Sequence, residues 1–349
     1  MRTVEIAGRK IGHGFPCFII AEAGVNHNGD LSLARQLVDL AAQSGADAVK
    51  FQTFKADKVI AAHAPKAHYQ LQTTGADESQ LEMVRKLELS FEAFRELYAY
   101  CQTKKILFLS TPFDDESTDF LDELGVTAFK VSSGEITNLP FLAHVARKAK
   151  PMLVSTGMSD LREVETAVRT IEQAGNSNLV LLHCTSNYPA DSSDVNLRAM
   201  HTMAAAFERP VGYSDHTLGT EVSLAAVALG ACVVEKHFTL DRNLSGPDHR
   251  ASLEPLELQS LVRGIRIVEA ALGHGRKEPA ASEANTAAVA RRSLVAGRDI
   301  TSGTVLCAAD VAVMRPGTGL APAMLSQLLG RTARVNIPAG TLLSLEMLA

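Results

Sequence analysis

The chain has 349 residues, of which 46% are hydrophobic and 21% are charged, and its formal net charge is −5. This length accommodates one large domain together with a small one, and the composition is typical of a folded globular protein. The acidic balance and the absence of tryptophan disfavour a nucleic-acid-binding protein, which usually presents a basic surface and stacking aromatic residues.

Nothing in the sequence predicts export or insertion into a membrane. The N-terminal segment MRTVEIAGRKIGHG carries charges and lacks an apolar stretch long enough for a secretory signal. The most apolar run, residues 224–234, is far shorter than the about 18 residues that a membrane-spanning helix needs. The five cysteines are dispersed and form no CxxC pair, which is typical of reduced thiols. We therefore expect a cytoplasmic protein without a membrane partner.

A repeating unit extends from residue 17 to residue 272, in which a short apolar run is followed by a polar cluster and an amphipathic helix. The runs do not alternate apolar with polar residues, so they predict strands buried on both faces, at residues 17–21, 48–51, 106–109, 128–131, 152–155, 179–183, 211–214 and 233–237. Helix patterns follow the N-cap residues Asp30 and Ser90, and Pro255 is typical of a first helical turn. Eight such units predict a (β/α)8 TIM barrel. A doubly wound open sheet is the alternative, but no GxGxxG motif follows the first strand.

Two regions depart from this repeat. The connection at residues 54–89 is long and polar, so we expect it to form an excursion over the barrel mouth rather than a core element. After the barrel domain (residues 1–272) we expect a linker (273–290) and a small β-rich domain (291–349). In the small domain, ITSGTVL at 300–306 recurs as IPAGTLL at 337–343. This echo predicts two pseudo-symmetric halves, each with a tight glycine turn.

Polar side chains are concentrated at the carboxyl ends of the predicted strands, where TIM barrels carry their active sites. Those grouped at this mouth include His27, Asp215 and Lys236. Lys50 and Lys130 lie beside buried strands, where an ammonium group is costly to bury unless it meets an anion. With nearby hydroxyl groups they fit a cradle for phosphate or carboxylate; these hydroxyls belong to Thr111, Ser133, Ser155 and Ser214. Two alternatives stay open. The lysines pair merely with Glu22 and Glu135, or one of them is a Schiff-base nucleophile, as in aldolases.

Two histidines, His216 and His237, end the seventh and eighth predicted strands, which are neighbours in a closed barrel. Two imidazoles side by side, with carboxylates and water nearby, suit a divalent transition metal with open coordination positions. Hydrogen-bonded strand ends or general acid–base catalysis are the alternative roles. Cys184 also lies near this region, and we interpret it as a core residue, with a place in the lining of the pocket as the alternative.

Eleven segments of the chain, in the same order, resemble the sialic acid synthase family with its C-terminal antifreeze-like (SAF) domain. The barrel segments are AEAGVNHNGD (21–30), KFQTF (50–54), STPFD (110–114), KVSSGE (130–135), STGMSD (155–160), HCTSNYP (183–189), GYSDHT (212–217), EKHFTLD (235–241) and GPDHRASLEP (246–255). The SAF-like segments are RRSLVA (291–296) and MRPGTGLAP (314–322). The resemblance covers nearly the whole chain.

The resemblance implies an N-acetylneuraminate synthase, which condenses phosphoenolpyruvate with N-acetylmannosamine and releases phosphate. It implies a divalent metal, Mn2+ first and Mg2+ or Co2+ otherwise, held by His216 and His237. Phosphoenolpyruvate would be bound by Lys50, Thr111, Lys130, Ser133, Ser155, Asn187 and Ser214. The sugar would be contacted by Gln52, Tyr188, Asp248, Glu135 and Arg315, and the catalytic groups would be Glu22, Glu135, His216 and His237. Family members are domain-swapped homodimers, so Arg315 would reach the barrel of the partner chain.

Three other functions remain open from the sequence. The first is an enzyme whose acceptor is the diacetamido-trideoxy sugar that gives N,N'-diacetyllegionaminic acid. No residue of the sequence distinguishes the synthases that use this sugar from those that use N-acetylmannosamine. A Schiff-base aldolase on the same barrel is the second alternative. A sugar- or ice-binding protein is the third, but it would not need the polar set from Glu22 to His237.

Overall fold

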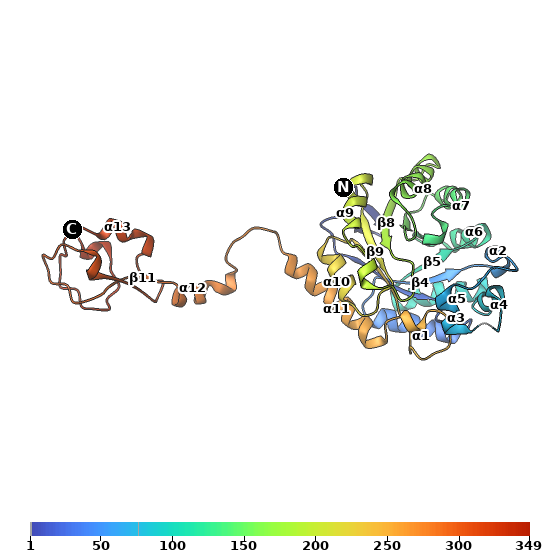
Figure 1. The fold of residues 1–349 in the computed structure, drawn as a ribbon, viewed down its shortest axis with the longest axis horizontal. Coiled ribbons are helices and arrows are strands. Elements are labelled where there is room, and N and C mark those ends of the chain that lie inside the picture. The colour runs from blue at the N-terminus through green and yellow to red at the C-terminus, as the bar shows by residue number, and fades with distance from the viewer. Residues whose placement is uncertain (1, 76) are drawn as a thin grey trace. The chain divides into compact units, whose positions relative to one another are not determined.

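The computed structural model describes residues 2–75 and 77–349, which fall into two compact units. The first unit ends at Gly273, and the second is His274–Ala349. Figure 1 shows the first unit as a ring of helices around central strands.

The first unit is built on eight parallel strands, and each of the eight predicted runs forms one of them. The sheet order is β5-β4-β3-β10-β9-β8-β7-β6, and the two end strands β5 and β6 also lie beside each other. The sheet therefore curls into the predicted TIM barrel. The strands are β3 (Phe18–Gly24), β4 (Ala48–Thr53), β5 (Leu107–Pro112), β6 (Phe129–Val131), β7 (Met152–Ser155), β8 (Leu179–Cys184), β9 (Val211–Asp215) and β10 (Val233–His237).

One long helix follows each barrel strand and covers the outside of the sheet (Figure 1). The predicted N-caps are confirmed, since Asp30 accepts from the backbone of Ser32 and Ser90 accepts from Ala93. Such bonds satisfy amide groups that have no partner inside the helix. The helices are α1 (Leu31–Gln43), α5 (Phe91–Lys104), α6 (Asp115–Leu124), α7 (Leu139–Ala146), α8 (Leu161–Gln173), α9 (Ala199–Phe207), α10 (Glu221–Ala228) and α11 (Pro255–Leu272).

A short hairpin that the sequence analysis did not predict closes the amino-terminal end of the barrel. Its strands are β1 (Val4–Ile6) and β2 (Arg9–Ile11). Val4, Ile6 and Ile11 join the apolar cluster that fills the barrel interior near Phe18 and Ile20. The opposite, carboxyl end of the strands is thereby left as the open mouth.

The excursion between β4 and α5 contains three short helices, α2 (Ala56–Val59), α3 (His68–Thr74) and α4 (Gln80–Arg85). Its start is attached to the barrel rim, and its two ends are attached to each other. The amide of Lys55 donates to Asp114 at 3.0 Å, and the amide of Ala56 donates to Glu88 at 2.5 Å. Gly29 lies so close to Lys86 that a Cβ atom would be 2.5 Å from the Lys86 carbonyl oxygen.

The second unit contains helix α12 (Ala284–Ala290), the antiparallel strands β11 (Ser293–Ala296) and β12 (Val311–Met314), and helix α13 (Leu325–Leu328). The repeated segments pair with each other. Ile300 and Ile337 exchange two backbone hydrogen bonds, of 2.9 and 2.7 Å. Gly303 and Gly340 both have a φ of more than +80°, a conformation that favours glycine. The predicted pseudo-symmetry is therefore present in the backbone.

None of the helices in residues 2–75 and 77–349 is long and apolar enough to cross a membrane. The location of the protein in the cell stays a prediction.

Candidate active site

The barrel mouth brings most of the predicted site residues together because consecutive strands end at one edge. Strand register places Glu22 of β3 opposite Lys50 of β4 on one side and His237 of β10 on the other. Side chains at cross-strand positions point to the same face of a sheet. The barrel interior therefore collects one polar side chain from the end of nearly every strand.

Lys50 lies at the centre of a buried ionic cluster. Its ammonium nitrogen is 2.7 Å from Glu22 Oε2, donates to Thr111 Oγ1 at 2.8 Å, and is 3.8 Å from Glu235 Oε2. The side chains of Lys50 and Glu22 are 3% and 1% exposed. Such a pair is strongly coupled because water screens it weakly.

Lys130 completes the cluster from the other side. Its ammonium nitrogen lies 3.6 Å from Glu235 Oε1 and donates to the Val131 carbonyl at 2.9 Å. Glu235 also accepts from Ser214 Oγ at 3.2 Å. The buried Ser155 hydroxyl has no hydrogen-bond partner among the described residues. Two ammonium groups with hydroxyls at hand suit a substrate that carries phosphate and carboxylate.

Glu235 is a site residue that the sequence analysis missed. It had named Glu22 and Glu135 as the possible partners of the two lysines. Only Glu22 takes that position, whereas Glu135 accepts from Asn138 Nδ2 at 2.7 Å. The available signal was spacing, since Glu235 precedes His237 by two residues and therefore shares its face of β10.

Burial changes the ionisation of the carboxylates at the mouth. Burial raises the pKa of Glu22 to about 7, against the opposing effect of Lys50 and with a further contribution from Glu235. Burial likewise raises the pKa of Asp248 to about 6, although His216 opposes the shift. The pKa of Glu235 is lowered, because Lys130 and Lys50 outweigh the effect of its burial. Glu22 is thus suited to exchanging a proton near neutral pH, and Glu235 to remaining charged.

The two predicted metal ligands lie side by side, with ring centroids 5.4 Å apart. His216 Nδ1 is 2.8 Å from the Thr185 carbonyl, which fixes the ring and leaves Nε2 for another partner. His237 Nδ1 is buried without a hydrogen-bond partner among the described residues and lies 4.0 Å from Asp248 Oδ2. This donor set fits a divalent metal that takes two imidazoles from the protein. Within the described ranges, no three His, Cys, Asp or Glu side chains form a ligand group.

Two glycines allow the backbone to approach these side chains. A Cβ atom at Gly24 would lie 3.3 Å from the His237 ring and 3.4 Å from Glu22 Oε1. At Gly157 it would collide with Ser186 Oγ and lie 2.9 Å from Ser133 Oγ. Any other residue at either position would therefore intrude on the mouth.

Of the other predicted site residues, some lie in the mouth and others are exposed at its rim or belong to the second unit. Gln52 donates to Glu22 Oε1 at 3.3 Å, and the Tyr188 ring packs on His216 with a centroid distance of 4.1 Å. The Ser133 hydroxyl accepts from the Gly157 amide at 3.0 Å. Asn187 is exposed at the rim, and its side chain accepts from the Tyr188 amide. Arg315 is an exposed residue of the second unit that directly follows β12, and its role stays a prediction.

Lys236 and Asp215, which the sequence analysis had grouped with the mouth residues, face away from it. The register places them opposite each other on β10 and β9, and Asp215 accepts from Ser223 of α10 at 2.6 Å. They form a buried ion pair of 2.8 Å behind the two histidines. The grouping was wrong because successive residues of a strand point to opposite faces.

His27, grouped with the mouth by sequence, is a buried structural residue. Its Nδ1 accepts from the Gly29 amide at 3.0 Å, and its ring packs 6.0 Å from that of Phe51. Burial lowers the pKa of His27 to about 4, and nearby His249 adds to this shift. The folded protein therefore holds His27 uncharged.

We expect the protein to lose stability as the pH falls from about 6.5 to 4. In this range His27 binds a proton in the unfolded chain but stays neutral in the folded protein, so acid favours the unfolded chain. A depressed histidine pKa contributes stability above the unfolded pKa, and acid removes it. The effect is up to about 3 kcal/mol at 1.36 kcal/mol for each pKa unit. His27→Gln should flatten the curve of unfolding free energy against pH in this window, as measured by urea titration. His201→Gln, at an exposed position, is the control; equal slopes for wild type and His27→Gln would contradict the assignment.

A TIM barrel whose mouth holds paired lysines, carboxylates and adjacent histidines defines a barrel enzyme built for an anionic substrate. The chain belongs to the NeuB family, which matches residues 37–277, and residues 291–349 match the SAF domain. These matches confirm the family resemblance that the sequence motifs indicated.

Two curated relatives and one solved structure cover most of the chain. The N,N'-diacetyllegionaminic acid synthase of Legionella pneumophila is 51% identical over 339 residues, which are 96% of this chain and 95% of the relative. The enzyme of that name from Campylobacter jejuni is 52% identical over 320 residues, 91% of this chain and 96% of the relative. The N-acetylneuraminic acid synthetase of Leptospira borgpetersenii, solved in complex with citrate, has a TM-score of 0.72 and 38% identity, covering 82% of this chain and 95% of that one.

Proposed function

We propose that this protein is an N,N'-diacetyllegionaminic acid synthase, which joins phosphoenolpyruvate to a 2,4-diacetamido-2,4,6-trideoxy-mannose and releases phosphate. The observation that carries the proposal is the identity of 51% and 52%, over nearly the whole chain, to two enzymes of that name. The resemblance of the sequence motifs alone implies N-acetylmannosamine first and this acceptor as the alternative. N-acetylneuraminate synthesis remains the second candidate, since the Leptospira structure carries that name at 38% identity.

The lysine cluster supports phosphoenolpyruvate as the donor. Lys50 and Lys130 are separated by Glu235, so both ammonium groups are held in place before substrate arrives. Preorganised donors of this kind stabilise charge without having to rearrange during the reaction. In the proposed complex they hold the phosphate and carboxylate together with the hydroxyl and amide groups of Thr111, Ser133, Ser155, Asn187 and Ser214.

His216 and His237 would hold a divalent metal, with Mn2+ the first choice and Mg2+ or Co2+ the others. When bound, such an ion supplies a Lewis acid for the carbonyl oxygen of the open-chain sugar. The Thr185 carbonyl fixes His216 for this role, and His237 Nδ1, which is buried and has no hydrogen-bond partner in residues 2–75 and 77–349, is consistent with it.

In the proposed reaction, Glu22 handles the proton of the attacking water. In the reaction the methylene carbon of phosphoenolpyruvate bonds to the aldehyde carbon, and the aldehyde oxygen takes up a proton. Water adds at C2 and gives up a proton, and the C2–O bond to phosphate then breaks. A carboxyl group with a pKa of about 7 can accept and return that proton.

The acceptor would lie against the rim formed by Gln52, Glu135, Tyr188 and Asp248. We propose that Arg315 reaches this rim from a second copy of the chain, in a homodimer with exchanged SAF domains. An arginine closing the site would also keep bulk water from the reacting atoms.

The test is phosphate release from phosphoenolpyruvate in the presence of each acceptor, with and without EDTA, followed by addition of Mn2+. Release that requires the diacetamido-trideoxy sugar, stops with EDTA and returns with metal is the expected result. A higher kcat/KM with N-acetylmannosamine would move the assignment to N-acetylneuraminate synthase. Activity that persists in EDTA, with borohydride trapping of pyruvate on a lysine, would instead identify an aldolase.

Arg315→Ala is expected to lower turnover by at least about 10²-fold while changing Tm little, since the side chain is exposed within its own unit. The control is Arg334→Ala, another exposed arginine of the same unit. Mixing Arg315→Ala chains with Lys50→Met chains tests the exchange directly. If Arg315 acts on the partner's barrel, each mixed dimer has one complete site and activity returns. No recovery on mixing, under conditions in which chains exchange, would place Arg315 in its own chain's site or in none.

A further inference from the structure

An aromatic column leads from the excursion to the two histidines. Tyr69, on α3, faces Tyr188 with ring centroids 5.1 Å apart. Tyr188 in turn packs on His216 at 4.1 Å and meets His237 edge-on at 5.6 Å. Tyr69 thus contacts the tyrosine that packs on both histidines, although neither the sequence motifs nor the proposed function gives Tyr69 a role.

The surroundings of Tyr69 place it at the acceptor end of the mouth. Burial raises the pKa of its hydroxyl, and the Asp248 carboxylate adds to this shift. The same Asp248 lies 4.0 Å from His237. Tyr69 therefore packs on Tyr188, which is proposed to contact the sugar, and feels the charge of Asp248, which is proposed to do the same. The Tyr69 side chain is half-buried.

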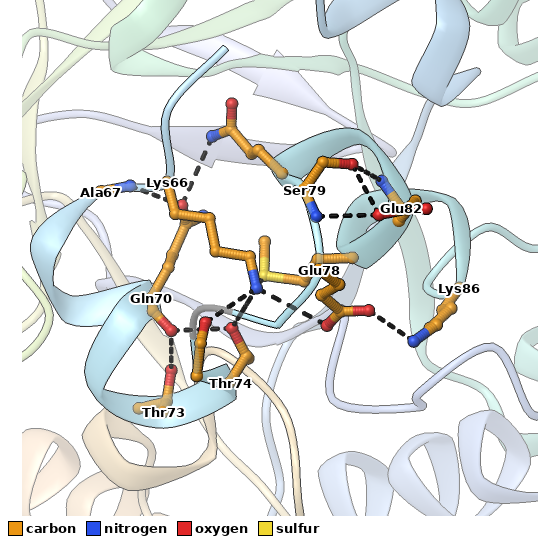
Figure 2. A network of polar contacts seen from close by, with 12 residues as sticks. Lys66, Ala67, Gln70, Thr73, Thr74, Glu78, Ser79, Glu82 and Lys86 are labelled. Carbon is orange, nitrogen blue, oxygen red and sulfur yellow. Dashed lines mark hydrogen bonds and ion pairs between the residues drawn. The ribbon is translucent and has the colours of Figure 1, made fainter. Parts of the chain in front are cut away.

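The helix that carries Tyr69 is held by a buried lysine rather than by a large apolar core. Lys66 Nζ donates to Thr74 Oγ1 at 3.0 Å and to the Gly75 carbonyl at 3.1 Å, and lies 3.6 Å from Glu78 Oε1. The Lys66 side chain is only 2% exposed, and Figure 2 shows its ammonium group at the centre of this network. Lys66 thereby ties the end of α3 to the start of the following turn.

Further contacts make the excursion one unit. Gln70 Oε1 accepts from the Ala67 amide at 2.9 Å, which caps the start of α3. Glu78 also pairs with Lys86 at the end of α4, so one carboxylate joins both halves of the excursion (Figure 2). A segment fixed in this way can hold an aromatic ring at a defined position over the mouth.

We propose that helix α3 covers the acceptor subsite and that Tyr69 is the specificity-determining residue of this helix, forming with Tyr188 an aromatic wall for the apolar substituents of the sugar. This inference rests on the proposed function. The diacetamido-trideoxy acceptor has a methyl group at C6 and an acetamido group at C4. N-acetylmannosamine carries hydroxyl groups on both of these carbons. Aromatic rings favour methyl groups over hydroxyls as neighbours, and one such group changes specificity by about 10–200-fold.

The test compares Tyr69→Ala, Tyr69→Phe and Leu71→Ala in steady-state kinetics with both acceptors. Leu71 is the matched control, because it lies on the same helix but is 42% exposed. For Tyr69→Ala we expect kcat/KM with the diacetamido-trideoxy sugar to fall by at least about 10-fold, and less with N-acetylmannosamine. The KM for phosphoenolpyruvate should change by less than about twofold. Tyr69→Phe keeps the ring and should retain the wild-type preference.

Lys66→Met provides a second variant that leaves the ring in place. It should raise amide hydrogen exchange in residues 68–74 and shift acceptor preference in the same direction as Tyr69→Ala. Thermal unfolding checks that each variant is folded.

Two outcomes separate this inference from the proposed function. An active wild-type enzyme whose acceptor preference is the same in Tyr69→Ala and Leu71→Ala would overturn the role of Tyr69 and leave the proposed function intact. A wild-type enzyme that releases no phosphate with either sugar would overturn both.

Discussion

Replacing Lys50 by methionine is expected to lower kcat/KM for phosphoenolpyruvate by about 10²–10³-fold, the effect of removing one preorganised donor from an anion site. Lys50 is the one group in the cluster that contacts Glu22, Thr111 and Glu235 together. Its loss removes a positive charge from the proposed phosphoenolpyruvate subsite. It also leaves Glu22 and Glu235 as like charges in a buried space, so Glu22 should bind a proton more tightly.

Steady-state phosphate release, with each substrate varied in turn, measures this effect. Lys148→Met is the control, since it removes an ion pair with Asp119 on the outside of the barrel. The double variant Lys50→Met/Glu22→Gln separates folding from function. It relieves the uncompensated carboxylate, so stability should recover while activity stays low. Wild-type kinetics for phosphoenolpyruvate in Lys50→Met would remove this lysine from the site.

The fold could be predicted from sequence because its determinants are local. Each barrel strand is a short run buried on both faces, and the residues that begin α1 and α5 are N-caps that act within three positions. Repetition of the unit then leaves a closed barrel as the simplest way to bury all the strands. The hairpin of β1 and β2 was missed because three-residue strands carry too little periodicity.

The site was predicted only as a set of residues, because the pairing of charges depends on strand register. The register places Glu235 opposite Ser214, and Lys236 opposite Asp215, one residue further on. Alternation then sends the first pair into the mouth and the second toward α10. In the sequence, the members of both pairs lie within two residues of a histidine, and no local pattern shows which pair faces the mouth. The approach of Tyr69 to Tyr188, 119 positions apart in the sequence, lies equally beyond local pattern.

Lys236→Met is expected to destabilise the barrel by about 3–5 kcal/mol, the usual cost of removing one partner from a buried ion pair. The side chains of Lys236 and Asp215 are 1% and 0% exposed, and their ion pair measures 2.8 Å. Without Lys236, the carboxylate of Asp215 keeps hydrogen bonds from Thr217 and Ser223 but loses its counter-charge. Removing Lys236 also deprives the Thr217 carbonyl of its 2.5 Å hydrogen bond.

Urea titration of the unfolding free energy tests this expectation, with Lys104→Met as the control. Lys104 forms an ion pair of similar length, 2.7 Å, with Asp39, but the two side chains are 38% and 31% exposed. The control should therefore cost at most about 1 kcal/mol. Because Lys236 and Asp215 directly adjoin His237 and His216 in the chain, the Lys236→Met variant should also bind Mn2+ more weakly where it is still folded. A loss of stability no larger than that of Lys104→Met would show that the pair is screened by water and does not hold the two histidine strands together.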